Sequence, residues 1–186
     1  MSRFKIERTP LDGLLLVQRT LLRDERGFFA RMFCARDLAE AGWAVSLAQV
    51  NHSRTTVRGC VRGLHFQRPP HGEHKLVSCL RGAVLDVAVD VRIGSPTYLQ
   101  WHGALLTADN GHALLVPPGF AHGFQALEDD VEMLYCNSAA HVADAEDGLN
   151  PLDADLAIAW PLPVVSMSPR DAGRALVAHG FSGVRL

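Results

Sequence analysis

The sequence predicts an all-β sandwich or barrel, and three observations carry this prediction. Short apolar runs rich in Val, Leu and aromatic residues recur along most of the chain. Gly, Pro, Asn or Asp residues punctuate most of the gaps between them, as at 81–82, 94–96, 109–111 and 117–119. Many short strands with regular spacing and turn signals are typical of sandwiches and barrels. The length of 186 residues is sufficient for one domain with a sizeable core, so we expect a single domain over 1–186.

The expected elements follow the chain in order. The strands are expected at 14–17, 45–50, 57–66, 75–80, 83–92, 98–106, 112–116 and 131–135. Helices are few, short and peripheral. One is expected at Ala35–Ala41, because Gly42 follows as a stop signal. A second is expected at Arg170–Ala178, before His179-Gly180.

The clearest predicted strand is Val84–Val91. Alternation with period two places the apolar residues at odd positions on one face, and Asp86, Ala88 and Asp90 on the other. Isolated carboxylates are costly to bury unless they are paired. The second face is therefore either exposed to solvent or lines a polar cavity. The pattern of this strand alone favours a solvent-exposed outer face.

Composition and charge exclude several classes of function. The net charge of -2 gives no bulk attraction to nucleic acid or to an anionic membrane, so neither partner is expected. The four cysteines show no CxxC pair or tight spacing, which fits a reducing cytoplasm better than a disulfide framework or a zinc site. The N-terminal segment lacks the apolar core of a signal peptide, and no apolar run is long enough to span a bilayer.

Four side chains are candidates for chemistry, and each is weak by itself. His65 lies in an apolar strand, where histidine is more often structural, and Lys75 opens a strand, where lysine is usually solvated. Tyr135 is expected as a packing aromatic, and His122 lies in a turn-rich stretch, where it would cap or contact a loop. If His65 and Lys75 meet in a hydrophobic barrel, however, they can remove a proton beside a carbonyl and hold the resulting enolate.

A metal site is not expected, although the chain has nine histidines. A barrel site needs several converging ligands. The close pair His71 and His74 lies in a Pro/Gly loop and faces no identifiable further ligand. The sequence also lacks a P-loop, a dinucleotide glycine fingerprint and a GxSxG elbow.

Nine segments taken together resemble the dTDP-4-dehydrorhamnose 3,5-epimerase family from about Asp24 to Asp171. In family order they are Asp24–Phe29, Gln49–Ser53, Arg62–Gln67, Lys75–Val77, Asp86–Arg92, Ser95–Thr97, Pro118–Phe124, Tyr135 and Trp160-Pro161. One such match is weak, whereas nine in order form a specific signal. The resemblance implies a jelly-roll barrel of the cupin type without metal or other cofactor, usually a homodimer. It also implies a nucleotide-linked 4-keto-6-deoxyhexose as substrate.

The resemblance also assigns roles to individual residues. By motif match, His65 is the base beside the keto group and Asp171 is its carboxylate partner. Lys75 stabilises the enolate oxygen, and Tyr135 returns a proton to the opposite face of the sugar. The matching segments place the substrate-binding residues at Arg26, Phe29, Gln49, Asn51, Arg62 and His122. Within this set, Arg62 is expected at the diphosphate and His122 in the pocket lining.

Strand parity tests this assignment. Arg62 and His65 are three residues apart, so a regular strand points them to opposite faces. Both reach one pocket only if Gly63 marks a bulge or if Arg62 serves another edge of the site.

The sequence also departs from the family pattern around the expected substrate site. Arg31 and Glu73 stand where glutamate and glutamine are expected. The run 136–141 replaces a lysine and a pair of tyrosines, and 151–153 replaces a Trp-Asn-Asp stretch. These positions lie outside the His65, Lys75, Tyr135 and Asp171 set.

The leading hypothesis is a cofactor-independent epimerase acting at C3 and C5 of the sugar. One alternative is the same chemistry at C3 or C5 only, or on a different nucleotide sugar. Another is a barrel that binds sugar nucleotides without catalysis, and a metal-dependent cupin oxygenase or isomerase is a third. Retention of a base on one side and an acid on the other favours catalysis.

Overall fold

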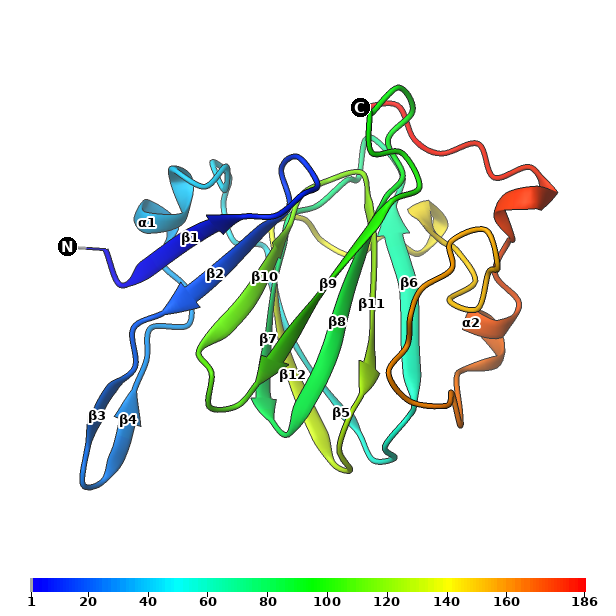
Figure 1. The fold of residues 1–186 in the computed structure, drawn as a ribbon. Coiled ribbons are helices and arrows are strands. Elements are labelled where there is room, and N and C mark those ends of the chain that lie inside the picture. The colour runs from blue at the N-terminus through cyan, green and yellow to red at the C-terminus, as the bar shows by residue number, and fades with distance from the viewer. Residues whose placement is uncertain (1) are drawn as a thin grey trace.

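The computed structural model describes residues 2–186, and two antiparallel β-sheets face each other across a shared interior (Figure 1). The six-stranded sheet has the order β1 (Phe4–Arg8), β2 (Leu15–Arg19), β10 (His112–Val116), β7 (Lys75–Arg81), β12 (Val131–Asn137) and β5 (Gln49–Thr55). The five-stranded sheet has the order β13 (Glu146–Gly148), β6 (Val61–Gln67), β11 (Phe120–Ala126), β8 (Ala83–Asp90) and β9 (Trp101–Thr107). This confirms the predicted all-β, cupin-like jelly roll.

The remaining elements are small and lie at the periphery. Strands β3 (Leu22–Asp24) and β4 (Gly27–Phe29) form a separate hairpin, which Figure 1 shows extending away from the two sheets. Helices α1 (Ala35–Ala39) and α2 (Pro169–Ala172) are short, as are the 3-10 turns η1 (Ala143–Ala145) and η2 (Val177–His179). No helix within residues 2–186 is long and apolar enough to cross a membrane.

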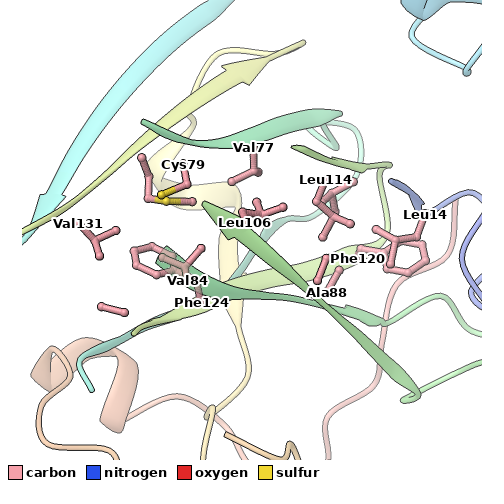
Figure 2. Close-up of a cluster of buried hydrophobic side chains, with 14 of the residues drawn as sticks. Leu14, Val77, Cys79, Val84, Ala88, Leu106, Leu114, Phe120, Phe124 and Val131 are labelled. Carbon is pink, nitrogen blue, oxygen red and sulfur yellow. The ribbon is translucent and has the colours of Figure 1, made fainter. Parts of the chain in front are cut away.

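The main core lies between the sheets. Its apolar side chains come from β7, β10 and β12 on one side and from β8, β9 and β11 on the other. Figure 2 shows part of this cluster, which includes Val77, Leu114 and Val131 from the six-stranded sheet and Val84, Leu106 and Phe124 from the five-stranded sheet. Burial of this apolar surface is the dominant force that joins the two sheets.

Each sheet also buries apolar residues on its outer face. On the five-stranded sheet, Leu64, Val87 and Ala121 pack against residues of the C-terminal segment such as Leu156 and Val184. On the six-stranded sheet, a second cluster includes Trp43 and Leu38 from the α1 region. Inner strands such as β8 and β10 are therefore buried on two faces, which explains their long apolar runs.

The prediction for the polar face of β8 was wrong. Asp86 and Asp90 face the interior and are both 0% exposed. Their burial is possible because each is paired: Asp86 contacts His122, and Asp90 accepts hydrogen bonds from Arg92, Ser95 and Thr97. The opposite, apolar face of β8 is covered by the C-terminal segment.

Several element boundaries differ from the prediction. The segment around His122, predicted as turn-rich, is the central strand β11, and all seven of its residues are buried. The predicted helix 170–178 is interrupted after Ala172, because Gly173 ends α2 and only a 3-10 turn follows. Residues 45–48 and 98–100 were predicted as parts of strands, but the observed strands do not include them. Strands β1, β3, β4 and β13 were not predicted.

A bulge lies in β6 at Gly63, which was one of the two alternatives that strand parity left open. His65 pairs with His122 and Arg62 pairs with Phe124, so β6 has one residue more than β11 between these two pairs. Gly63 adopts φ +118°, and a Cβ there would lie 2.6 Å from the Gly123 Cα. Only glycine fits this close approach of β6 and β11.

Candidate active site

A cavity of about 780 Å³ opens between the two sheets at the end formed by β5, β6, β7, β11 and β12. Its volume is typical of sites for ligands of drug or cofactor size. Eight of the ten predicted site residues line it: Gln49, Asn51, Arg62, His65, Lys75, His122, Tyr135 and Asp171. The sequence-based set therefore converges on one place in the fold, although its members span most of the chain.

His65 and Asp171 form a close pair. The Nε2 atom of His65 lies 2.6 Å from Asp171 Oδ1, and the backbone N–H of Gly63 donates to Asp171 Oδ2 at 3.3 Å. Ser168 is the N-cap of α2, and its side chain accepts from the Asp171 N–H at 3.0 Å. The short helix thus holds the carboxylate against β6.

The electrostatics of this pair suit a base and its partner. Burial raises the pKa of the Asp171 carboxyl, but the hydrogen bond and charge of His65 outweigh it and hold the pKa below its usual value. Asp171 is therefore an anion at neutral pH. Because the Nε2–H of His65 points to this carboxylate, the Nδ1 atom is left as the basic nitrogen.

Lys75 lies at the start of β7, beside the His65 strand. Its Nζ donates to the carbonyl oxygen of His65 at 3.4 Å and lies 3.3 Å from Glu73 Oε1. The side chain is only 13% exposed, which is unlike the solvated lysine that its position alone would suggest. A cation therefore faces the cavity beside the histidine.

Tyr135 comes from β12 in the opposite sheet to His65. Its phenol hydroxyl lies 3.2 Å from Ser53 Oγ of the neighbouring strand β5. Burial raises the pKa of Tyr135 above its usual value, so the phenol stays protonated at neutral pH. Its ring meets the His122 ring edge to face, with 6.3 Å between centroids.

His122 is held from behind by a buried carboxylate. Its Nε2 lies 2.9 Å from Asp86 Oδ1, whereas Asp86 Oδ2 is buried without a hydrogen-bond partner among residues 2–186. Burial raises the pKa of Asp86, and the charges of His122 and Lys75 oppose that rise. His122 is thus an oriented wall residue of the cavity rather than the loop contact predicted from its neighbours.

The polar rim of the cavity comes largely from β5 and β6. Arg62 donates from Nε to Thr55 Oγ1 at 2.8 Å and from Nη2 to the Arg54 carbonyl oxygen at 3.0 Å, which fixes its guanidinium at the rim. Gln49 accepts from the His141 N–H through Oε1. Asn51 is the cross-strand partner of Tyr135.

Arg26 and Phe29 do not reach this cavity. Both lie on or beside the β3–β4 hairpin, outside the two sheets (Figure 1). Phe29 is 64% exposed, and Arg26 contacts Asp24 two residues away. These two predicted substrate-binding residues are therefore separated from the other eight within one chain.

The two sheets present different groups to the cavity. Arg62, His65 and His122 come from the five-stranded sheet, with Asp171 behind them. Lys75 and Tyr135 come from the six-stranded sheet. A flat ligand between the sheets would have a basic nitrogen near one face and a phenolic proton near the other.

Three functional neighbours were not predicted: Ser53 at Tyr135, Asp86 at His122, and Asn137 at Glu73. The sequence signal for Asp86 is a carboxylate within an otherwise apolar strand, which is consistent with a buried and paired side chain. Ser53 ends the matched segment Gln49–Ser53, but nothing in the sequence pairs Ser53 with Tyr135 or Asn137 with Glu73, because these partners lie on other strands or loops. Within residues 2–186, no group of three or more His, Cys, Asp or Glu side chains is arranged to hold a metal ion.

Fold and site together define a cupin-like jelly-roll protein with a histidine–aspartate pair and a buried tyrosine facing one interior cavity. The model of the dTDP-4-dehydrorhamnose 3,5-epimerase family matches residues 8–179. A dTDP-4-dehydrorhamnose 3,5-epimerase from Streptomyces griseus is 43% identical over 166 residues, which cover 87% of this chain and 82% of the relative. A dTDP-4-dehydrorhamnose 3-epimerase from Streptomyces niveus is 44% identical over 170 residues, covering 91% and 82%.

A solved structure extends the likeness to three dimensions. The dTDP-6-deoxy-D-glucose-3,5-epimerase of Legionella pneumophila Philadelphia 1, in complex with dTDP-4-keto-L-rhamnose, superposes with a TM-score of 0.92. It is 38% identical, and the match covers 98% of each chain. The chain belongs to the dTDP-4-dehydrorhamnose 3,5-epimerase family, a family of isomerases.

Proposed function

We propose that this protein inverts carbon centres next to the C4 keto group of a nucleotide-linked 4-keto-6-deoxyhexose. The observation that carries the proposal is the placement of His65 and Tyr135 on opposite sheets of one cavity. Inversion requires removal of a proton from one face of a carbon and delivery to the other. A base and an acid on opposite walls meet that requirement.

His65 is the proposed base. A free imidazole has a pKa of about 6.5, close to working pH, which suits proton abstraction. Asp171 fixes the orientation of the ring at 2.6 Å and stabilises the imidazolium that forms. The bulge at Gly63 turns His65 and Arg62 toward the same cavity.

Lys75 is the proposed stabiliser of the enolate. A proton beside a ketone is only weakly acidic, so most of the barrier is the charge that develops on the keto oxygen. A fixed cation near that oxygen is the largest help available, and loss of such a group costs on the order of a hundredfold in rate. The buried ammonium of Lys75 beside the His65 strand meets this need.

Tyr135 is the proposed acid. Its raised pKa keeps the proton on the phenol until a carbanion forms nearby. Ser53 holds the hydroxyl from β5 at 3.2 Å, so the proton donor has a defined position. Because the keto group of the substrate already acidifies the neighbouring carbons, this chemistry needs no cofactor.

The substrate is proposed to extend from this acid–base set along the rim. Arg62 would take the diphosphate, with His122 lining the sugar pocket and Gln49 and Asn51 on the β5 side. The ligand of the Legionella pneumophila relative, dTDP-4-keto-L-rhamnose, supports a thymidine diphosphate sugar as the substrate class. A second candidate is inversion at C3 only, because the Streptomyces niveus relative is a 3-epimerase.

We also propose that the chain works as a homodimer. Arg26 and Phe29 match segments expected at the substrate, yet their hairpin lies away from its own cavity. The hairpin exposes Leu22, Phe28 and Phe29, and exposed apolar surface of this kind favours a partner. In the proposed dimer each hairpin completes the cavity of the other subunit.

We further propose a single domain that functions in a reducing cytoplasm. The shared core between the sheets supports the first point. The four free thiols Cys34, Cys60, Cys79 and Cys136 support the second.

The experiment for the main proposal is incubation with dTDP-4-keto-6-deoxyglucose in deuterium oxide, followed by NMR of the sugar. Deuterium at both C3 and C5 is expected for the 3,5-epimerase, and deuterium at one carbon identifies the restricted form. Absence of exchange with any 4-keto nucleotide sugar would refute the proposal. The His65→Ala variant is the control: a purely binding barrel would keep its ligand affinity and have no activity to lose.

A further inference from the structure

Glu73 is a buried carboxylate of the cavity that the proposed mechanism does not use. Its side chain is 8% exposed, and its Oε1 atom lies 3.3 Å from Lys75 Nζ. Its other oxygen, Oε2, accepts from Asn137 Nδ2 at 2.8 Å. Burying a carboxylate is unfavourable unless its oxygens are partnered, and here both are.

The three residues form a rigid arrangement. Lys75 and Asn137 are cross-strand partners on β7 and β12, so the backbone fixes the distance between them. Asn137 in turn fixes the orientation of the Glu73 carboxylate. The carboxylate is therefore an anchored hydrogen-bond acceptor for the flexible Lys75 side chain.

The anchored carboxylate limits where the ammonium can point. An ammonium has three N–H donors. One is directed to Glu73 Oε1 and a second to the carbonyl oxygen of His65 at 3.4 Å. With two directions taken, the third N–H is left for an oxygen atom inside the cavity.

We propose that Glu73 is a positioning residue that orients the Lys75 ammonium toward the keto oxygen of the substrate. The inference rests on the proposed function, in which Lys75 stabilises the enolate. Glu73 contributes geometry rather than charge, because its negative charge beside the ammonium weakens the positive field at the enolate oxygen. A neutral acceptor of the same shape would serve equally well.

Asn137 makes that neutral acceptor feasible. Its Oδ1 atom is buried and has no hydrogen-bond partner among residues 2–186. In Glu73→Gln, rotation of the Asn137 amide lets Oδ1 accept from the new glutamine NH2, while the glutamine oxygen still accepts from Lys75. Glu73→Asp does the reverse, since it keeps the charge but withdraws it by one methylene.

Steady-state kinetics of three variants separate geometry from charge. For Glu73→Ala and Glu73→Asp we expect kcat to fall about tenfold or more with KM changed less than about twofold, because only the transition-state contact is lost. Glu73→Gln is expected to stay within about threefold of the parent kcat. A parent-like kcat in Glu73→Ala, or a loss in Glu73→Gln as large as in Glu73→Ala, would overturn the inference.

A second measurement does not depend on activity. The chain has only two lysines, Lys5 and Lys75, so ¹⁵N-lysine labelling gives a simple ammonium NMR spectrum. Lys5 is 72% exposed and serves as the rapidly exchanging reference. We expect a slowly exchanging Lys75 ammonium signal in the parent and in Glu73→Gln that is lost in Glu73→Ala.

The assay of substrate proton exchange and the NMR of the Lys75 ammonium can give negative results independently of each other. If the parent exchanges no proton with any 4-keto nucleotide sugar but shows the expected NMR pattern, the proposed function fails and the restraint of Lys75 by Glu73 stands. If the Lys75 signal of Glu73→Ala matches that of the parent, the restraint itself is refuted, whatever the activity. Thermal melting of each variant checks that it is folded.

Discussion

The imidazole Nε2 of His65 lies 2.6 Å from the carboxylate Oδ1 of Asp171, although 106 residues separate the two in sequence. His65 sits on a central strand of the five-stranded sheet, whereas Asp171 sits on a four-residue helix. The Ser168 cap and the Gly63 N–H hold the carboxylate in place. The pair therefore depends on the C-terminal segment folding back over the sheet.

Replacement of Asp171 by asparagine tests this pair. The amide has the same shape but no charge to stabilise the imidazolium, so we expect kcat to fall on the order of a hundredfold or more. The measurement is initial-rate kinetics with dTDP-4-keto-6-deoxyglucose. Asp144→Asn, the same change on an exposed side chain, should leave kcat unaltered. An Asp171→Asn enzyme with parent kcat would remove Asp171 from the mechanism.

Replacement of Tyr135 by phenylalanine should separate proton removal from inversion. Without the phenol, His65 still removes the proton and can return one to the same face. We therefore expect deuterium from the solvent to enter the substrate while the yield of inverted sugar falls steeply. NMR of the sugar in deuterium oxide measures both quantities, and His65→Asn is expected to lose both. Inversion at the parent rate in Tyr135→Phe would contradict the role of Tyr135.

Asp90 provides a test of stability rather than activity. Its buried carboxylate accepts from Arg92, Ser95 and Thr97, and these contacts fix the turn after β8. Asp90→Asn is expected to lower the free energy of unfolding by about 2–4 kcal/mol at pH 7, because an amide cannot accept from all three groups. Urea denaturation measures the difference.

The pH dependence of this difference has a definite sign. Burial raises the pKa of Asp90, but the hydrogen bonds from Arg92, Ser95 and Thr97 outweigh it and hold the pKa below its usual value of 3.8. A depressed pKa in the folded state stabilises the protein above the unfolded value, and that stabilisation is lost as pH falls through the folded value. The gap between parent and Asp90→Asn should be constant at neutral pH and narrow below 3.8. A gap that widens with acid would contradict the assignment.

Subunit mixing tests whether the β3–β4 hairpin acts in the partner. Arg26→Ala removes the hairpin contribution and His65→Asn removes the base, so each pure dimer is expected to be impaired. In the mixed dimer, the subunit with intact His65 receives an intact hairpin. Random mixing in equal amounts should then restore about a quarter of the parent sites. The readout is activity after subunit exchange, and no recovery in confirmed mixed dimers would place the hairpin outside the site.

The fold class followed from local sequence patterns, whereas most of the site followed from the resemblance to a known family. Alternating apolar strands and turn signals predicted an all-β architecture, and ordered motifs predicted His65, Lys75, Tyr135 and Asp171. Strand parity left two alternatives for Arg62 and His65, a bulge at Gly63 or different edges of the site, and the structure shows the bulge. The strands, the turns and the motifs can each be recognised within one short segment of the sequence.

The errors came from contacts between distant segments. Period two in β8 identified the polar face correctly, but that face lies toward the interior between the sheets, because the C-terminal segment, far away in sequence, covers the apolar face. The polar face carries Asp86 and Asp90, whose partners His122 and Arg92 make burial tolerable. Glycines and a proline around His122 suggested turns, yet Gly123 is required there because a Cβ would lie 2.5 Å from the Arg62 carbonyl oxygen. In this strand glycine indicates close packing rather than a bend.

The placement of His65 and Tyr135 on opposite sheets also determines how the two groups regain their starting protonation states after each inversion. In the proposed mechanism each inversion leaves His65 with one proton too many and Tyr135 with one too few. The two groups lie on different walls, so this imbalance is corrected through water at the mouth of the cavity rather than by direct transfer between them. A sugar inverted at two carbons therefore requires two complete cycles, with the acid and the base restored in between. Access of water to both walls is then as necessary for double inversion as the catalytic groups themselves.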